Sequence, residues 1–152
     1  MTNKPLKIKK IESDSNPVYR KLLSLQKSRG IVKEGECLIG GEKVIAEILR
    51  DRIGDLKNSY WVFCADEHEL FTADGPDTLI HLSKTLFNQI DALGTRAPLL
   101  CVPVPALEDW NPESSPTSTE VLCALGDPGN LGALMRSAEA FGVSTVVLLE
   151  EA

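Results

Sequence analysis

The segment from residue 119 to residue 149 is the part of this 152-residue sequence that most constrains its fold. An apolar run at 119–125 is followed by the tight sequence GDPGN at 126–130. A helical pattern over 131–141, Gly142 and a second apolar run at 144–149 come after it. This order predicts a βαβ unit with two parallel strands, which places the chain in the α/β class. Two parallel strands and one helix cannot cover both faces of a sheet, so we expect this unit to be incomplete.

Residues 1–106 also alternate between helical and strand-like patterns. Helices are expected at 17–30, 42–53, about 67–72 and 83–94, and strands at 36–39, 60–65, 78–81 and 98–103. This alternation predicts a small α/β/α sandwich. Prolines, serines and acidic residues then mark a linker. We therefore expect a domain over 1–106, a linker over 107–118 and the start of a second domain over 119–152.

Basic residues are concentrated at the start of the chain, although the net charge of the whole chain is −6. Residues 1–33 carry nine Lys/Arg and two acidic residues, a balance of +7 that leaves −13 for the remainder. Such a segment is typical of a solvated tail or of a surface that contacts a polyanion. No apolar run is long enough for a membrane span, and the N-terminus does not resemble a secretory signal, so we expect a cytoplasmic protein.

The cysteines and histidines suggest no metal or redox site. Cys37, Cys64, Cys101 and Cys123 form no C-x-x-C pair, and three of them lie in apolar, strand-like runs. A reduced thiol in such a run behaves as a small hydrophobe. The two histidines, His68 and His81, are isolated in the sequence and receive no role.

The glycine-rich turn differs from the nucleotide-binding patterns that it superficially resembles. Its glycines, Gly126, Gly129 and Gly132, have the spacing G-x-x-G-x-x-G rather than G-x-G-x-x-G, and no G-K-[ST] sequence follows. In the helix after the turn, the apolar face is expected to consist of Leu131, Leu134, Met135, Ala138 and Phe141. Arg136 and Glu139 lie three residues apart, which fits either a surface ion pair or a functional site.

The run Asp127-Pro128-Gly129-Asn130-Leu131-Gly132-Ala133-Leu134-Met135-Arg136-Ser137-Ala138-Glu139-Ala140-Phe141-Gly142-Val143 resembles the first conserved motif of the SpoU/TrmH branch of the SPOUT RNA methyltransferases. Earlier segments are also similar to that family: Ile11, Ser13, Asn16-Pro17 with the basic helix, 41–45 (GEKVI) and 102–105 (VPVP). Gly40-Gly41 stands where such proteins often carry Glu-Gly, so no role is transferred to that acidic position.

The resemblance implies a part of an S-adenosylmethionine-dependent enzyme that methylates a ribose 2′-hydroxyl of rRNA or tRNA. It implies that 1–106 is an RNA substrate-binding domain similar to kink-turn-binding ribosomal proteins. Residues 119–152 would then begin a knotted SPOUT domain that forms homodimers. The candidates for RNA contact are Lys7, Lys9, Lys10, Arg20, Lys21, Lys27 and Arg29. Tyr19 is the only aromatic residue among these basic residues. Such a scarcity of aromatic side chains favours recognition of RNA shape and backbone over base stacking.

The resemblance also assigns catalytic roles to Asn130, Arg136 and Glu139. Arg136 would assist deprotonation of the 2′-hydroxyl, Asn130 would cap the helix and hold the loop, and Glu139 would orient Arg136. The family's second and third motifs, which bind the cofactor, have no counterpart in these residues. We therefore expect the 152-residue chain to bind no S-adenosylmethionine and to be inactive by itself.

Two alternatives share the sequence features of the first interpretation. One is a non-catalytic RNA-binding module in which 119–152 is a remnant SPOUT segment or a dimerisation element. The other is an α/β interaction protein whose basic segment is a solvated arm without affinity for RNA at physiological salt. Charge reversal at Lys9, Lys10, Arg20 and Lys21 distinguishes this last interpretation from the two that involve RNA.

Overall fold

The computed structural model describes residues 6–51, 58–64, 75–94, 96–113 and 118–149. The chain divides into two compact units, residues 1–106 and 107–152, and each is described by itself. The expected helix at 67–72 and the expected helix stop at Gly54 lie outside the described residues. Within the described part, no helix is long and apolar enough to span a membrane.

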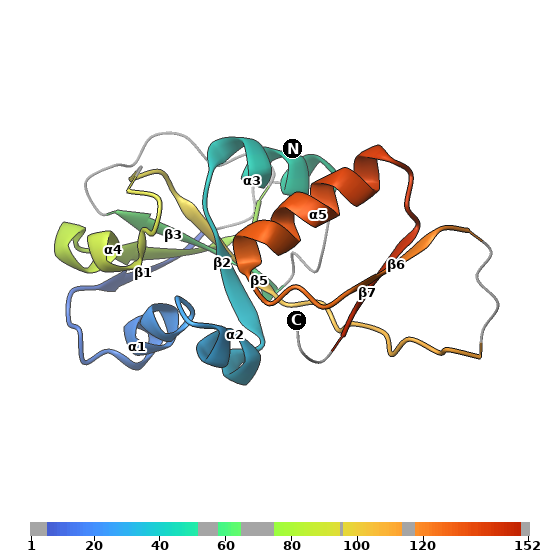
Figure 1. Cartoon of the computed structure of the whole chain (residues 1–152). Helices are drawn as coiled ribbons and strands as arrows, with labels where there is room; N and C mark the ends of the chain where they lie inside the picture. The colour runs from blue at the N-terminus through green and yellow to red at the C-terminus, as the bar shows by residue number, and fades with distance from the viewer. Residues whose placement is uncertain (1–5, 52–57, 65–74, 95, 114–117, 150–152) are drawn as a thin grey trace. The chain divides into compact units, whose positions relative to one another are not determined.

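A mixed five-stranded sheet forms the centre of the first unit (Figure 1). Its strand order is β1-β4-β3-β5-β2, where β1 is Lys7–Ile11, β2 is Glu36–Ile39, β3 is Tyr60–Cys64, β4 is Thr78–Leu82 and β5 is Leu99–Pro103. Strands β1 and β3 run parallel to β4, whereas β5 is antiparallel to both β3 and β2. Strand β1 is therefore one edge of the sheet and β2 is the other.

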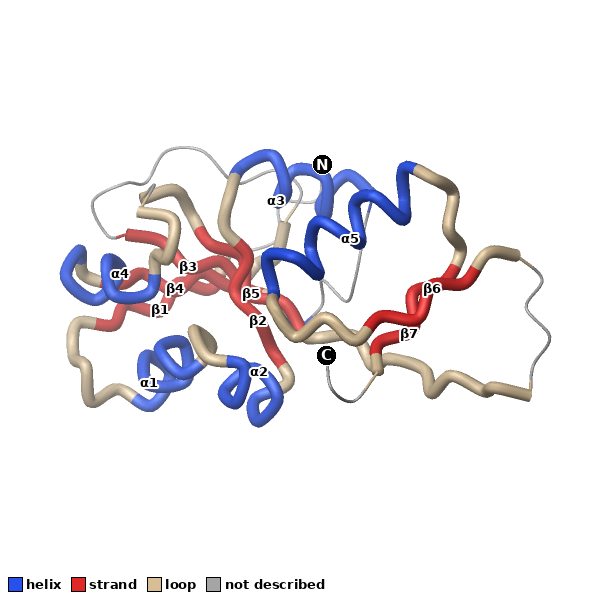
Figure 2. The backbone as a smooth tube through the Cα atoms, in the orientation of Figure 1, coloured by secondary structure: helices blue, strands red, loops and turns tan. Residues whose placement is uncertain are grey.

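Among its described residues, this unit has the helices α1 (Pro17–Ser24), α2 (Ser28–Glu34), α3 (Glu42–Asp51) and α4 (Lys84–Ile90) (Figure 2). Helix α1 begins as predicted at the Asn16-Pro17 pair, where the Asn16 side chain accepts a 2.9 Å hydrogen bond from the Val18 backbone N–H. That side chain satisfies one of the amide groups that have no partner in the first turn of a helix.

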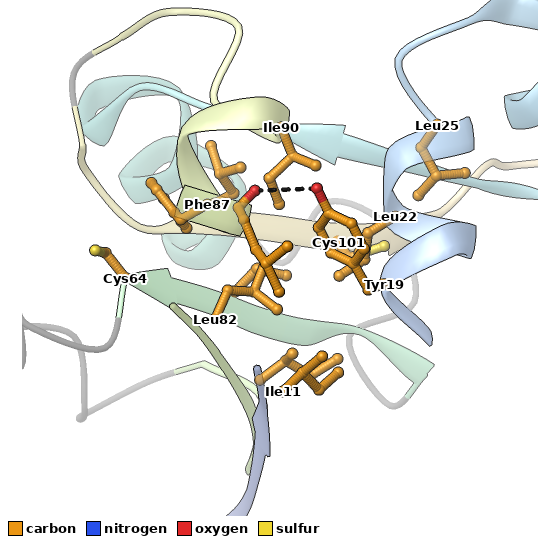
Figure 3. Packing of buried hydrophobic residues seen from close by; sticks show 13 residues of the cluster. Ile11, Tyr19, Leu22, Leu25, Cys64, Leu82, Phe87, Ile90 and Cys101 are labelled. Carbon is orange, nitrogen blue, oxygen red and sulfur yellow. Dashed lines mark hydrogen bonds between the residues drawn. The ribbon is translucent and has the colours of Figure 1, made fainter. Parts of the chain in front are cut away.

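The sheet buries apolar side chains on both faces. On one face, residues of α1 and α4 such as Tyr19, Leu22 and Phe87 pack with β-strand residues in a single cluster (Figure 3). On the other face, Ile45 of α3 packs with Trp61 and other strand residues in a second cluster. The Tyr19 hydroxyl donates hydrogen bonds to Gln89 and to the Leu86 carbonyl, which joins α1 to α4. The predicted mixed α/β architecture is confirmed in this unit.

The helix expected over 17–30 is wrong as a single element, because the chain forms two helices there. Lys27 adopts an extended conformation (φ −122°, ψ 141°), which interrupts the helical hydrogen bonding between α1 and α2. The two helices then pack closely enough that Gly30 is buried. The helical spacing of Val18, Leu22 and Leu25 predicts one helix that continues to Gly30, and it gives no sign of a break at Lys27.

Sequence reasoning also missed β1 and misjudged the end of α4. The sequence marks residues 7–11 (KIKKI) as basic and predicts no strand there, but they form an edge strand whose first four residues are exposed. Lysines on an edge strand disfavour pairing with another chain. Helix α4 ends at Ile90 and leaves Leu93 exposed, since the Asp91 side chain accepts hydrogen bonds from the backbone N–H groups of Gly94 and Arg96.

The second unit is the predicted βαβ unit. Strands β6 (Glu120–Cys123) and β7 (Thr145–Leu148) are parallel and are connected by α5 (Pro128–Ala140). Gly142, which follows the helix, has a φ of +69°, a conformation that favours glycine at the end of a helix. Cys123, Ala138 and Val147 are buried, whereas two residues of the expected apolar helix face, Met135 and Phe141, are exposed.

We expect Gly30→Ala to destabilise the first unit. A Cβ at this position would lie 1.9 Å from the Ser24 carbonyl oxygen, so the two helices would have to separate. The expected loss is about 1–3 kcal/mol in the free energy of unfolding, measured by urea denaturation. Val32→Ala on the same helix is the control, since Val32 is 83% exposed. A loss no larger than that of the control would contradict the close packing of α1 and α2.

Candidate nucleic-acid interface and arginine site

The seven basic residues predicted to contact RNA lie in two separate places on the first unit. Lys7, Lys9 and Lys10 lie on β1 at one edge of the sheet, and all three are exposed. Lys7 and Lys9 share a face of the sheet with the buried Ile11, whereas Lys10 lies on the opposite face. An edge strand with alternating lysines thus presents positive charge on both sides of the sheet.

The other four basic residues lie on α1, on α2 or at the turn between them. Arg20, Lys27 and Arg29 are exposed, whereas Lys21 is half-buried. Helix α2 contacts β2, the edge strand opposite β1. Four strand spacings separate the two edges, or about 19 Å. The structure therefore does not bring all seven residues into one patch.

The Lys21 ammonium is engaged with a carboxylate rather than extended into solvent. Its Nζ lies 2.6 Å from Oε1 of Glu36, and the two side chains are only 30% and 19% exposed. It also lies 5.8 Å from the centre of the Tyr60 ring. This contact joins α1 to β2 and β3, so Lys21 holds the basic helix against the sheet. Its role as an RNA contact stays a prediction.

Glu36 accepts three side-chain hydrogen bonds. Besides Lys21, the Tyr60 hydroxyl donates to Oε2 at 2.9 Å and the Cys101 thiol donates to the same oxygen at 3.3 Å. Burial by itself raises the pKa of Glu36, but these hydrogen bonds and the charge of Lys21 outweigh it and hold the pKa below its ordinary value. Burial raises the pKa of the Cys101 thiol to about 12 and also raises the pKa of Tyr60. Glu36 is thus the negatively charged member of the group, beside the neutral Tyr60 and Cys101.

A groove of about 490 Å³ lies along α1 and α2. It is lined by Pro17, Val18, Arg20, Lys21, Ser24, Lys33 and Glu34. Lys33 belongs to the basic segment but is not one of the predicted RNA contacts. Its side chain is 78% exposed and lies 3.2 Å from Glu34. Only the break between α1 and α2 brings Lys33 to the same groove as Arg20, which no single-helix pattern could show.

The predicted catalytic residues lie on α5 of the second unit. The expected helix cap at Asn130 is wrong, because α5 begins at Pro128 and Asp127 is the capping residue. Oδ1 of Asp127 accepts a 2.8 Å hydrogen bond from the backbone N–H of Asn130. Asn130 is therefore capped by Asp127 and is exposed in the first turn of the helix. A proline at the first helical position with an aspartate before it is the signal that identifies this cap in the sequence.

The Arg136 side chain extends toward the N-terminal end of α5. Its Nη1 would lie 3.4 Å from a Cβ added at Gly132, one turn earlier in the helix. Arg136 and Glu139 are both exposed, and the ion pairs identified among the described residues do not include one between them. The absence of a side chain at Gly132 gives the guanidinium room along the helix. The candidate catalytic site on α5 is therefore the exposed guanidinium of Arg136 on a helix that Asp127 caps.

The described residues of the second unit do not fit S-adenosylmethionine as a bound group. A ligand of this size is normally held in a concave and mostly apolar pocket. Asp127, Gly129 and Asn130, around the first turn of α5, are instead exposed. Cys123 and Val147, the buried strand residues, belong to the small core of the unit. The chemistry that these residues can supply is that of the Arg136 guanidinium, which binds and stabilises negatively charged oxygen.

The comparisons with known proteins point to RNA methyltransferases. No protein-family model matches the chain. The chain is similar to the ribosomal RNA small subunit methyltransferase G 2 of Syntrophobacter fumaroxidans, with 39% identity over 147 residues that cover 94% of this chain and 29% of that protein.

Solved structures of methyltransferases match the chain in fold. An RNA 2′-O ribose methyltransferase matches at a TM-score of 0.63 and 24% identity, covering 95% of this chain and 57% of that chain. The AdoMet-bound rRNA methyltransferase from Sinorhizobium meliloti matches at 0.65 and 19%, with 93% and 54% coverage. The SpoU methyltransferase AviRb from Streptomyces viridochromogenes, in complex with AdoMet, matches at 0.66 and 16%, with 88% and 52% coverage.

The mixed α/β fold of the chain thus matches part of the SpoU methyltransferase structures. The resemblance predicted from the sequence is confirmed at the level of the fold: the structure of the chain is like that of SpoU/TrmH-family RNA methyltransferases and covers about half of those chains. It spans less than a third of the curated relative, 29% of its length.

We expect Glu36→Gln to lower the stability of the first unit at neutral pH by about 1–3 kcal/mol, because Lys21 loses its charged partner. The folded pKa of Glu36 is below the ordinary value of 4.5, so its contribution is present above that pH and is lost as the pH falls through the folded pKa. The difference in unfolding free energy between the parent chain and the variant should therefore shrink in acid. Urea denaturation at several values between about pH 3 and pH 7, a range that spans the ordinary carboxylate pKa, measures this difference.

Glu47→Gln provides the matched control for this experiment. Glu47 lies on α3 and is exposed, so the same change of charge should alter stability by less than about 0.5 kcal/mol. A difference between the parent chain and Glu36→Gln that stays constant over the whole pH range would contradict a charged Glu36 at the centre of this group.

Proposed function

We propose that this chain supplies the RNA-binding and arginine-bearing part of an RNA 2′-O-ribose methyltransferase that acts on rRNA or tRNA. The observation that carries the proposal is the 39% identity to a ribosomal RNA methyltransferase across 94% of the chain. The fold match to an RNA 2′-O ribose methyltransferase supports the reaction type. Similarity of residues 1–106 to kink-turn-binding proteins, dimerisation through residues 119–152 and a cytoplasmic location belong to the same proposal.

The surface of the first unit supports a role in RNA binding. Exposed cations lie on β1 and along α1 and α2, and phosphate contacts of this kind supply most of the non-specific affinity for RNA. Tyr19, the one aromatic residue in the basic segment, is buried against α4 and cannot stack on a base. Recognition would therefore rest on the shape and the backbone of the RNA.

Arg136 supports the methyl-transfer part of the proposal. Its exposed guanidinium can donate two hydrogen bonds to a phosphate, or stabilise the negative charge that develops on a 2′-oxygen as it loses its proton. The Asp127 cap fixes the start of the helix that carries it. The predicted orienting role of Glu139 would act through this arginine, and the part of the Asn130 prediction that remains is that it holds the loop around the site.

A non-catalytic RNA-binding module is the second candidate. One observation favours it: the residues around the first turn of α5 are exposed and form no enclosed site for S-adenosylmethionine in the described structure. The two candidates agree on RNA binding and differ only in the consequences of changing Arg136.

We expect the 152-residue chain to bind a labelled RNA hairpin with a strong dependence on salt. Fluorescence anisotropy between about 50 and 200 mM salt should give a slope of at least about two in log affinity against log salt. The double variant Lys9→Glu/Arg20→Glu should lose most of this affinity. Lys43→Glu/Lys84→Glu has the same change of charge at exposed positions elsewhere and should lose much less. Equal losses, or no RNA binding by the parent chain, would contradict the proposal.

The form of the protein isolated from its source cells decides between the two candidates, and its intact mass should be determined first. If that form transfers methyl groups to RNA, Arg136→Ala should lower kcat by about 100-fold or more without lowering the midpoint of thermal unfolding. Arg136→Lys keeps the charge but not the paired donors and should recover only part of the rate. An unchanged rate in Arg136→Ala would remove this residue from the mechanism.

A further inference from the structure

The groove along α1 and α2 exists because the chain breaks at Lys27. In one continuous helix, Arg20 and Lys33 would lie about 20 Å apart along the axis and on nearly opposite sides, at 1.5 Å and about 100° per residue. The extended Lys27 and the close approach of Gly30 to Ser24 bring α2 back along α1. Arg20 and Lys33 consequently line the same groove.

The three cations of the groove are not equivalent. Lys21 is held at 2.6 Å by Glu36 in a half-buried ion pair. Arg20 is exposed, and Lys33 is 78% exposed with only a surface contact to Glu34 at 3.2 Å. Surface ion pairs contribute little to stability, so a phosphate group can displace Glu34 far more easily than it can displace Glu36.

We propose that this groove binds the phosphodiester backbone of RNA, with Arg20 and Lys33 as the phosphate contacts and Lys21 as a positioning residue. The proposal rests on the RNA-binding function proposed above and assigns that function to one site. The groove combines cations from two helices with the apolar surface of Pro17 and Val18, which suits the alternation of charged phosphate and less polar sugar along a strand.

Glu34 gives the site a built-in competitor. Its carboxylate lies beside Lys33 and also lines the groove, where it would repel a phosphate. Removing this charge should therefore strengthen RNA binding, which a purely structural role for Lys33 and Glu34 would not predict. Removing Glu36 should instead weaken RNA binding, because the loss of its ion pair with Lys21 loosens the helix that carries Arg20.

The test measures binding of a labelled RNA hairpin to the 152-residue chain over a range of salt concentrations. Lys33→Ala should lower affinity about five-fold at low salt and reduce the salt slope by about one. Arg20→Ala/Lys33→Ala should reduce the slope by about two, and Glu34→Gln should raise affinity about two-fold. The matched controls, Lys43→Ala and Glu47→Gln on α3, should change neither quantity.

Lys21→Met distinguishes positioning from contact. It should lower the midpoint of urea unfolding and leave the salt slope unchanged under conditions in which the variant is folded. A slope reduced by about one with unchanged stability would make Lys21 a phosphate contact and overturn the division of roles.

The remaining outcomes separate this inference from the proposed function. If Lys33→Ala and Lys43→Ala weaken RNA binding equally, the groove is not the site, although RNA binding itself stands. If heparin binds as tightly as RNA and loses affinity in the same variants, the groove is a general polyanion site and RNA is not its specific occupant. If the parent chain does not bind RNA, both the proposed function and this inference fail.

Discussion

The burial of both faces of the five-stranded sheet is the constraint on which the first unit depends. Residues of α1 and α4 cover one face around Val62 and Ile80, and α3 covers the other around Trp61 and Leu100. Alternate residues of β3 and β4 therefore point into two separate apolar clusters, which explains why these strands read as continuous apolar runs. The helices are fixed in place by that packing, and the basic side chains on their outer surfaces are fixed with them.

A half-buried polar group at the edge of this apolar arrangement determines how the basic helix packs on the sheet. Glu36 on β2 is joined to Lys21 on α1 and to Tyr60 and Cys101 on the two neighbouring strands. Each of the three donors stabilises this half-buried carboxylate, so the loss of any one of them costs stability. The same group that stabilises the fold thus removes one cation from the set available to a ligand and leaves Arg20 and Lys33 beside the groove.

In the second unit, by contrast, many apolar side chains stay exposed. One helix and two parallel strands bury Cys123, Ala138 and Val147 but leave Leu122, Leu148 and Phe141 exposed. The helix is nevertheless well defined at both ends, by the Asp127 cap and by Gly142. Local signals therefore specify this element even where packing is sparse, and they present Arg136 on an exposed surface as the proposed function requires.

The sequence by itself determined the features that depend on short-range chemistry. These include the Asn16-Pro17 helix start, the strand–turn–helix–strand order of residues 119–149, the buried strands around Val62 and Leu100, and the resemblance to SpoU/TrmH methyltransferases. Helix caps, turns and hydrophobic periodicity involve residues that are close in the sequence, so they can be recognised from the sequence alone. The RNA-contact and catalytic roles of individual residues remain predictions.

Only the tertiary structure decided how distant charges are grouped. The break at Lys27, the pairing of Lys21 with Glu36 and the position of Lys33 beside Arg20 follow from helices packing on a sheet. The separation of the β1 lysines from α2 follows from the strand order. None of these has a signature in sequence spacing, because each depends on which surfaces are buried together. The sequence shows that residues 1–33 are basic. Packing determines that some of these cations lie on the edge strand β1, that Lys21 is held by Glu36, and that Arg20 and Lys33 line the groove.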